Sequence, residues 1–285
     1  MPKVLVKKTI APKINLIELH APLIAAKALP GQFIVLRIDD NGERIPLTIA
    51  KKDIQKGTIT IIFQEAGAST KHLSCLKEGD DILDLTGPLG KAADIEKFGT
   101  VVCIGGGVGT PEVYPVAEAY KKAGNKVITI IGGRNKDLVL FEDELRAASD
   151  EVYIMTDDGS AGKKGLVTDA LKEIIGRETV NLVSAVGPTI MMKVISELTK
   201  IHSIPTLVSL NPIMLDATGM CGVCRVTVGG KIKFACVDGP EFDGHQVDFA
   251  ELMSRQKTFV DEEKIALNEF MKKNCSDDNP NCRCK

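Results

Sequence analysis

The segment between residues 100 and 210 constrains the fold most, because short apolar runs alternate there with helical patterns. The apolar runs are rich in β-branched residues, as in TVVCI at residues 100–104. Such alternation produces βαβ units, whose parallel sheet is covered by helices on both faces. The expected strands are 100–104, 126–131, 151–155, 181–186 and 205–210, and the expected helices are 111–123, 141–148, 166–175 and 190–199.

Turns follow four of these strands at their carboxyl ends, where parallel sheets bind their ligands. The first turn reads GGGVGT over residues 105–110, which departs from the usual G-x-G-x-x-G dinucleotide fingerprint. The others are GGR at 132–134, TDDGS at 156–160 and GPTIMM at 187–192. Three of the four are glycine-rich, so that backbone can approach a ligand closely. Together they predict a nucleotide-binding edge.

Arg134 ends the second strand of this segment, where an acidic residue would otherwise hold a ribose. An arginine there can accept the 2′-phosphate of NADP, stack on adenine or pair with Asp137. The choice between NAD and NADP is therefore open. Asp157 and Asp158 are interpreted as turn residues rather than cofactor contacts.

The first 97 residues have a different pattern, with short β-branched runs broken by Pro, Gly, Asn and Asp. We expect about six antiparallel strands, in a barrel or a sandwich. GAST at residues 67–70 is expected to begin a helix, which is either a capped surface helix or an anion-binding N-terminus. Pro46 lies inside a strand pattern, which favours an edge position or a neighbouring ligand. The strand patterns are 3–10, 14–22, 32–39, 43–52, 58–66 and 80–88.

Three cysteines, Cys221, Cys224 and Cys236, follow at the spacing C-x2-C-x11-C in a glycine-rich loop with a short strand pair. Extending the pattern to Asp216 gives the plant-type [2Fe–2S] spacing, with aspartate in place of the first cysteine. A structural zinc site that takes His245 as a fourth ligand, and a thiol redox pair, are the alternatives. The cluster is favoured because its spacing uses all three cysteines and assigns Asp216, whereas a thiol pair leaves Cys236 unexplained and the x11 spacing is unusual for a zinc finger.

Composition excludes several classes of partner and compartment. The net charge is −2, which gives no reason to expect nucleic acid or an anionic membrane as partner. No apolar stretch has the length of a transmembrane helix or of a signal-peptide core. Grouped cysteines in a chain of this kind indicate metal ligands in a reducing cytoplasm. A helix over 261–273 is expected to pack through Ile265, Leu267, Phe270 and Met271, and the tail cysteines, Cys275, Cys282 and Cys284, are expected to make a subunit contact or remain thiols.

These three parts predict a multidomain chain, with a β-barrel at 1–97, an α/β parallel-sheet domain at 98–209 and a small cluster domain with a helix and tail at 210–285. This order resembles the ferredoxin–NADP reductase superfamily. Within it, the chain resembles the electron-transfer subunit of dihydroorotate dehydrogenase. It is closer still to the small subunit of NADH-dependent ferredoxin:NADP oxidoreductase, the beta subunit of sulfide dehydrogenase. The resemblance is most specific in ERIPLTIA at 43–50, GGRNKDL at 132–138 and LNPIMLDATGMCGVC at 210–224.

The resemblance implies that the barrel binds FAD and the α/β domain binds NAD(H), with NADP(H) as the alternative. Thr48 would tune the flavin through its hydroxyl, and Asp216 would be the fourth cluster ligand. Two departures are Ile45, where the family commonly has arginine, and Thr110-Pro111-Glu112, where its nicotinamide loop often has Ala-Pro. The implied flavin contacts are Pro46, Leu47, Thr48, Gln64, Gly67, Ser69 and Thr70, and the implied nicotinamide contacts are Gly105, Gly106, Gly107, Gly109, Gly187, Pro188 and Met191.

The expected function is that of an electron-transfer flavoprotein subunit. It would exchange hydride between NAD(H) and FAD and pass single electrons through the [2Fe–2S] cluster to a larger flavin and iron–sulfur subunit. The resemblance implies electron bifurcation, with ferredoxin reached through the complex. The alternatives are the dihydroorotate dehydrogenase electron-transfer subunit and, from another class, a zinc-stabilised nucleotide-binding regulatory module.

Overall fold

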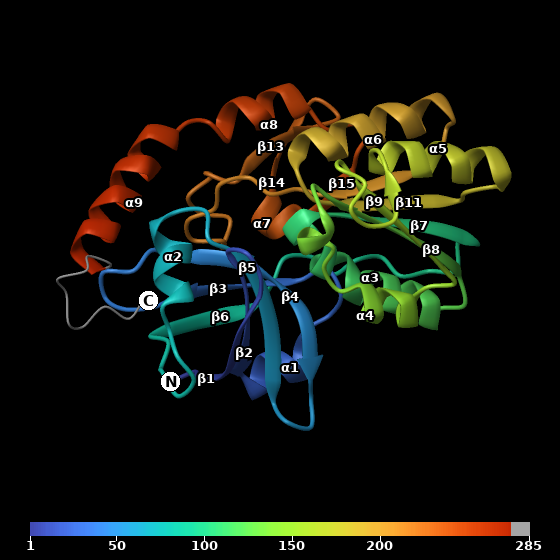
Figure 1. Cartoon of the computed structure of the whole chain (residues 1–285). Coiled ribbons are helices and arrows are strands. Elements are labelled where there is room, and N and C mark those ends of the chain that lie inside the picture. Colours follow the sequence, from blue (N-terminus) through green and yellow to red (C-terminus); the bar gives the residue numbers. More distant parts are fainter. Residues whose placement is uncertain (275–285) are drawn as a thin grey trace.

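The computed structural model describes residues 1–274 and begins with a six-stranded antiparallel sheet (Figure 1). The strand order is β1-β2-β5-β4-β3-β6, so neighbouring strands are mostly joined by short turns. Two short helices, α1 and α2, accompany this sheet. The strands are β1 (Val4–Ala11), β2 (Ile14–His20), β3 (Phe33–Arg37), β4 (Ile45–Asp53), β5 (Thr58–Gln64) and β6 (Asp84–Leu89), and the helices are α1 (Pro22–Lys27) and α2 (Ala68–Ser74).

Hydrogen bonds between the two ends of this sheet close it into a barrel. The Val4 amide donates to the Asp80 carbonyl at 2.9 Å, and the Gly79 amide donates to the Val4 carbonyl at 2.8 Å. The Ile82 amide likewise donates to Pro2 at 2.9 Å. Alternate side chains of the strands, among them Ile17 and Ile59, are fully enclosed in one apolar core. The predicted barrel is confirmed.

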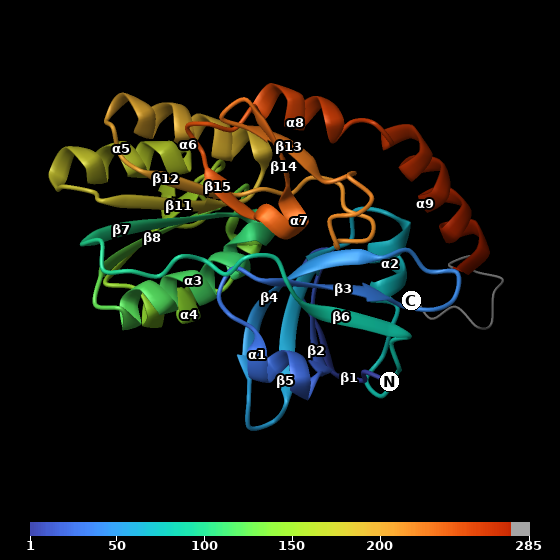
Figure 2. The same cartoon turned by 180° about the vertical axis from the view of Figure 1, so that it is seen from behind.

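The second sheet has the order β10-β9-β8-β7-β11-β12-β15 and is parallel except at β15. Its central strands are apolar on both faces, because helices cover both (Figures 1 and 2). Helices α3 and α4 lie on one face, and α5 and α6 lie on the other. The strands are β7 (Thr100–Gly106), β8 (Lys126–Gly133), β9 (Glu151–Thr156), β10 (Lys163–Lys164), β11 (Leu182–Val186) and β12 (Thr206–Ser209). The helices are α3 (Thr110–Lys122), α4 (Glu142–Ala148), α5 (Val167–Arg177) and α6 (Thr189–Ile201), with single turns η1 (Gly107–Gly109) and η2 (Lys136–Leu138).

The chain beyond β12 packs onto this sheet rather than standing apart. Strand β15 (Glu241–Asp243) pairs antiparallel with β12, and helix α8 (Phe249–Arg255) places Leu252 in the same core as Met192 and Ile195 of α6. Neither element is predicted from the sequence. The predicted strand pair is present as β13 (Arg225–Val228) and β14 (Lys231–Phe234), followed by the one-turn helix α7 (Ala235–Asp238).

Helix α9 (Val260–Asn274) continues from α8 and runs past α2 at the side of the barrel (Figures 1 and 2). The predicted helix is confirmed, but its packing is slight. Leu267 and Phe270 are half-buried, and the Phe270 ring centroid lies 5.4 Å from that of His72. Ile265 is 59% exposed, because the helix contacts the body along one narrow side. The tail cysteines, Cys275, Cys282 and Cys284, lie outside the described residues. In residues 1–274, no helix is both long and apolar enough to cross a membrane.

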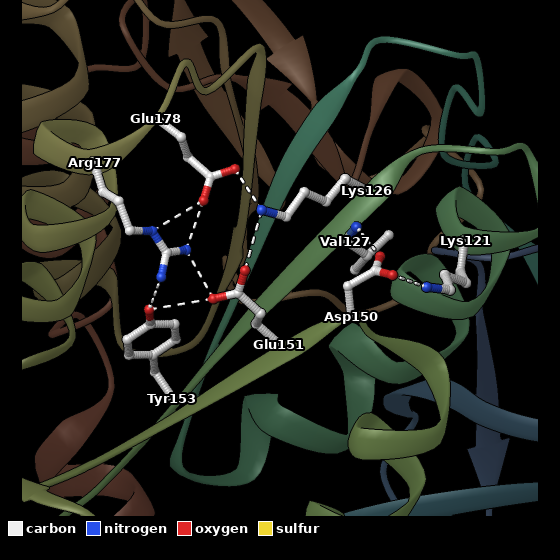
Figure 3. Close-up of polar contacts among 8 residues, drawn as sticks. All are labelled: Lys121, Lys126, Val127, Asp150, Glu151, Tyr153, Arg177 and Glu178. Carbon is white, nitrogen blue, oxygen red and sulfur yellow. Dashed lines mark hydrogen bonds and ion pairs between the residues drawn. The ribbon is translucent and has the colours of Figure 1, made fainter.

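An ion-pair network joins the amino ends of β8 and β9 to the end of α5 (Figure 3). The Lys126 ammonium lies 2.7 Å from Glu178 and 3.1 Å from Glu151, and Arg177 lies 2.7 Å from Glu151. The Arg177 hydrogen bond lowers the pKa of Glu151, and the Lys126 hydrogen bond lowers that of Glu178. The stability that these pairs add is present above the usual carboxyl pKa and is lost as pH falls. They are partly exposed and face away from the glycine turns, so we assign them a small structural role.

Glu241 places a carboxyl at the start of β15. Burial, with a smaller contribution from the charge of Asp94, raises the pKa of Glu241 to about 7. A carboxyl with a raised folded-state pKa is accommodated best when neutral, so its ionisation destabilises the fold as pH rises from about 4.5 through 7. The side chain keeps part of its surface exposed, which limits the effect to about 1–3 kcal/mol.

We therefore expect Glu241→Gln to raise the thermal unfolding midpoint at about pH 8 and to change it little at about pH 4.5. Thermal unfolding followed by circular dichroism measures this difference. Glu269→Gln, on the exposed face of α9, is the control and should show no such pH dependence. An equal gain at both pH values would contradict the buried-carboxyl explanation.

Candidate functional site

A cavity of about 570 Å3 lies between the barrel and the carboxyl ends of the parallel strands. Strands β4 and β5 supply one wall, and the turns after β7, β8 and β11 supply another. The segment 209–214 supplies a third wall and leads directly to Asp216. The cavity therefore lies where all three predicted parts of the chain meet.

Most of the predicted cofactor residues line this one cavity. They come from segments that are far apart in sequence, on β4, at the end of β5 and in the turns of the parallel sheet. Whether they touch the predicted cofactors stays a prediction. The predicted residues that line the cavity are Pro46, Leu47, Thr48, Gln64, Gly106, Gly107, Gly109, Arg134, Gly187 and Pro188.

The glycines of the turns after β7 and β11 allow backbone to touch backbone. A Cβ atom on Gly109 would lie 2.8 Å from the Val186 carbonyl oxygen, and one on Gly106 would lie 2.5 Å from the Met191 sulfur. Gly187 has φ +153° and approaches the Gly106 backbone closely. A Cβ atom on Gly105 would meet Thr110. A side chain on Gly109 or Gly187 would therefore separate the two turns.

A second cavity of about 330 Å3 adjoins the first along the edge of the sheet. Gly106, Gly107, Arg134 and Pro188 line both cavities, so the two share a wall. Met191 lines the second cavity, as does Asp157, which the sequence predicts only as a turn residue. Gly107, which lines both cavities, has no atom within 4 Å of its Cβ position and so leaves open space beside the backbone.

The predicted pyrophosphate residues lie elsewhere, at the start of α2. Thr70 caps the helix, because its hydroxyl oxygen accepts from the Gly67 amide at 3.1 Å and from the Ala66 amide at 2.9 Å. The Ser69 hydroxyl donates to Glu43. Gly67, Ser69 and Thr70 line neither cavity described above. In the structure Thr70 caps the helix, and contact of these three residues with a cofactor stays a prediction.

Glu112 is a cavity residue that the sequence does not single out. It lies in the first turn of α3, and the Thr48 hydroxyl on β4 donates a hydrogen bond to its carboxyl at 3.0 Å. Burial raises the pKa of Glu112 to about 7, although the Thr48 hydrogen bond acts to lower it. The only signal in the sequence is the departure Thr110-Pro111-Glu112 from the family's usual loop.

The predicted cluster ligands lie on the loop before β13 and on α7. The Cys224 and Cys236 sulfurs are 3.2 Å apart, and both residues are buried, whereas Cys221 is exposed. Burial, with Cys224 as a further cause, raises the pKa of Cys236. The donor set of soft sulfurs on a short loop fits an iron–sulfur cluster, whose binding would displace thiol protons.

Asp216 begins the same loop, and its side chain is hydrogen-bonded to the backbone amide of Cys221. Its carboxylate accepts from the amides of Thr218 and Cys221, both at 3.0 Å. The Thr218 hydrogen bond, followed by that from Cys221, lowers the pKa of Asp216. Ala217 is buried and has φ +57°, an uncommon conformation for a non-glycine residue. The loop thus holds an ionised carboxylate beside Cys221, and ligation by Asp216 stays a prediction.

His245, which the zinc interpretation takes as a ligand, is engaged elsewhere. Its Nε2 atom lies 2.9 Å from the Thr199 hydroxyl. In the described part of the chain, no three Cys, His, Asp or Glu side chains converge as the ligands of a single metal ion do. The ligands of a two-iron cluster are spread over two metal atoms and so are spaced more widely. The geometry of the loop gives zinc no support.

Comparison with known proteins assigns the family. Residues 211–248, which contain all four predicted ligands, match the model of the iron–sulfur cluster binding domain of dihydroorotate dehydrogenase B. The chain is 49% identical to the dihydroorotate dehydrogenase B (NAD(+)) electron transfer subunit homolog of Thermotoga maritima, over 89% of this chain and 90% of that protein. It is 35% identical to the electron transfer subunit of Fusobacterium nucleatum, over 77% and 86% of the two chains. The chain belongs to the family of dihydroorotate dehydrogenase B electron transfer subunits.

Two solved structures are similar to this chain in fold. A chain described in work on flavin-based electron bifurcation by NADH-dependent reduced ferredoxin-NADP oxidoreductase matches with TM-score 0.90 and 45% identity, over 95% of this chain and 98% of that one. Phthalate dioxygenase reductase matches with TM-score 0.59 at 16% identity and shows the shared fold alone. The expected resemblance and the expected fold class are confirmed.

The fourth ligand position of this family member yields a prediction. A thiolate donates more electron density to iron than a carboxylate does, so Asp216→Cys should retain about two irons per chain and lower the cluster's reduction potential. Iron analysis and redox titration followed by EPR measure both quantities. Glu262→Gln, which alters an exposed carboxylate on α9, is the control and should leave the potential unchanged. Unchanged iron content, EPR signal and potential in Asp216→Ala would exclude the aspartate as a ligand.

Proposed function

We propose that this chain is an oxidoreductase subunit that takes hydride from NADH and delivers single electrons to a larger partner subunit. FAD, when bound, exchanges a hydride and releases electrons singly, and a [2Fe–2S] cluster carries one electron at a time. The residues of the chain supply position and electronic environment. The observation that carries the proposal is the meeting of three walls at one cavity: β4, the glycine turns, and segment 209–214.

The contribution of each wall follows from its residues. Pro46, Leu47 and Thr48 would hold the flavin ring against β4, with the Thr48 hydroxyl at its edge. The glycine turns would admit a nicotinamide to the opposite side, because Gly107 carries no side chain and no atom lies within 4 Å of its Cβ position. Segment 209–214 passes from this cavity to Asp216 within a few residues, so a cluster on Cys221, Cys224 and Cys236 would lie close to the flavin.

The partner proposed is a larger flavin and iron–sulfur subunit in the cytoplasm, and the complex is proposed to bifurcate electrons between NADPH, NADH and ferredoxin. The 45% identical structural match favours this type, as does Asp216, where the resemblance implies a fourth cysteine in the dihydroorotate dehydrogenase subunits. The names of the curated relatives favour a second candidate, the electron transfer subunit of a dihydroorotate dehydrogenase. Co-purification of the native partner separates the two, because one partner would carry iron–sulfur clusters and the other a dihydroorotate site.

The proposal is tested by anaerobic purification followed by an absorption spectrum and titration with NADH and with NADPH. We expect flavin bands, a cluster shoulder at longer wavelength and bleaching by NADH. The same titration decides the nucleotide preference that Arg134 leaves open. A colourless protein that contains zinc and no flavin would overturn the proposal and favour the regulatory-module alternative.

A further inference from the structure

The hydrogen bond between Thr48 and Glu112 crosses the boundary between the barrel and the parallel sheet. Thr48 stands on β4, and Glu112 stands in the first turn of α3, which begins at the glycine turn. Both residues line the cavity between the domains. We propose that Glu112 is a proton-holding positioning residue, which sets whether the Thr48 hydroxyl donates or accepts a hydrogen bond inside the cavity. This inference deepens the proposed function and rests on it.

The inference follows from counting donors. A threonine hydroxyl has one hydrogen to donate, and an ionised carboxylate can only accept. When Glu112 is ionised, the hydrogen of Thr48 is committed to the carboxylate, as in the 3.0 Å bond, and the hydroxyl oxygen can only accept from a ligand. When Glu112 is protonated, its own hydrogen can be donated to Thr48, which frees the threonine hydrogen to point into the cavity. One proton on Glu112 therefore reverses the polarity that Thr48 presents.

That reversal matches what a flavin ring needs. The oxidised ring offers a nitrogen acceptor at its edge, whereas the reduced ring carries a hydrogen at the same nitrogen. When Glu112 is neutral, Thr48 can donate its hydrogen to the nitrogen of the oxidised ring. When Glu112 is ionised, the Thr48 oxygen can accept the hydrogen of the reduced ring. The negative charge of a reduced flavin acts in the opposite direction and favours the neutral acid. The hydrogen-bond effect acts through the direct Thr48 contact and is taken as the larger, so flavin reduction should favour the ionised form of Glu112.

Few described polar groups near Glu112 affect its protonation besides the Thr48 hydroxyl. Within residues 1–274, Thr48 is the hydrogen-bond partner of its carboxyl, and burial raises its pKa to about 7. Lys51, on the same strand as Thr48, does not pair with the Glu112 carboxyl. Its ammonium lies 2.9 Å from Glu144 and over the Tyr114 and Phe141 rings. Titratable or charged groups on the elements around it include Arg134 after β8, Glu144 on α4, Tyr114 and Glu118 on α3, and Cys103 on β7.

A purely structural role fits the site less well. A carboxyl that only stabilises the fold is normally paired with a cation or several backbone amides, as Glu151 is with Arg177. Glu112 has neither, and it opens onto the cavity. Glu241 shares the raised pKa but does not line the cavity, so it is the place of Glu112 beside Thr48 at the cavity wall that distinguishes it.

The inference is tested by redox-triggered infrared difference spectroscopy of the FAD-loaded full chain between about pH 5 and about pH 9. Labelling the protein with 13C-glutamate shifts the carbonyl bands of glutamic acids and so identifies them. We expect one neutral-acid band near pH 7 that shifts with the label, changes in size on flavin reduction and is absent in Glu112→Gln. Glu118→Gln, which alters an exposed-side carboxyl of the same helix, should keep the band. Thr48→Val should move its titration upward by about one pH unit, because the lost hydrogen bond favours the charged form.

The outcomes separate this inference from the proposed function. If FAD binds and bleaches with NADH but no labelled band depends on Glu112, the inference fails and the proposed function stands. A band that titrates identically with oxidised and reduced flavin would also overturn it, because Glu112 would then be insulated from the flavin. If the wild-type chain binds no FAD, both fail together. Should Thr48→Val lose FAD, Thr48→Ser keeps the hydroxyl and is expected to behave as the wild type.

Discussion

Replacing Cys224 by serine is expected to abolish the iron–sulfur cluster while leaving FAD and its reduction by NADH intact. Cys224 is 2% exposed and its sulfur lies 3.2 Å from that of Cys236, so no other described side chain can take its place without moving the loop. Serine is a poor ligand for iron at neutral pH because its hydroxyl stays protonated. The iron content should fall from about two per chain to near zero, and the cluster's EPR signal should disappear.

The matched control is Cys103→Ala, which alters a buried cysteine of β7 that belongs to the apolar core. It should retain iron and flavin together. Full iron content in Cys224→Ser would contradict the assigned ligand set. Simultaneous loss of FAD and iron would show instead that the loop and the flavin cavity fold as one unit.

The second large effect is expected at Gly109, where alanine should raise the KM for NADH by about 100-fold. Gly109 has an ordinary helical φ of −72°, so alanine introduces no backbone strain. Its Cβ would lie 2.8 Å from the Val186 carbonyl oxygen and 2.9 Å from the Gly187 Cα, and neither backbone atom can rotate away. The turns after β7 and β11 must therefore separate, at a cost of about 1–3 kcal/mol.

Steady-state kinetics with NADH and an artificial acceptor measure this change, and the FAD content should remain that of the wild type. Gly176→Ala is the matched control, because no atom lies within 4 Å of its Cβ position in α5. That variant should keep the wild-type KM and gain about 0.5–1 kcal/mol of stability. An unchanged KM in Gly109→Ala would mean that the nucleotide does not enter between the two turns.

The sequence predicts the sheets well, because their signals are local. The short β-branched runs of the first 97 residues and the βαβ rhythm after residue 100 are both visible within a few neighbouring residues. Glycines at 106, 109 and 187 can likewise be recognised from their position at strand ends, and the structure shows them in close backbone contact.

What the sequence does not predict depends on contacts between distant segments. Strand β15 has three residues and owes its place to pairing with β12 and to the core beneath it. Glu112 becomes notable only because folding brings α3 against β4 and Thr48. Thr70 shows the reverse, since a helix start at GAST is readable from local sequence, whereas a role in holding a pyrophosphate is not.

The central claim is that electrons pass from NADH through FAD to the cluster within this one chain. Anaerobic titration of the purified chain with NADH, followed by visible absorption and EPR, tests it most directly. The structure predicts that NADH bleaches the flavin and that the EPR signal of the reduced cluster then appears, whereas Cys224→Ser shows the bleaching alone. A wild-type flavin that bleaches while the cluster stays oxidised until dithionite is added would contradict the claim.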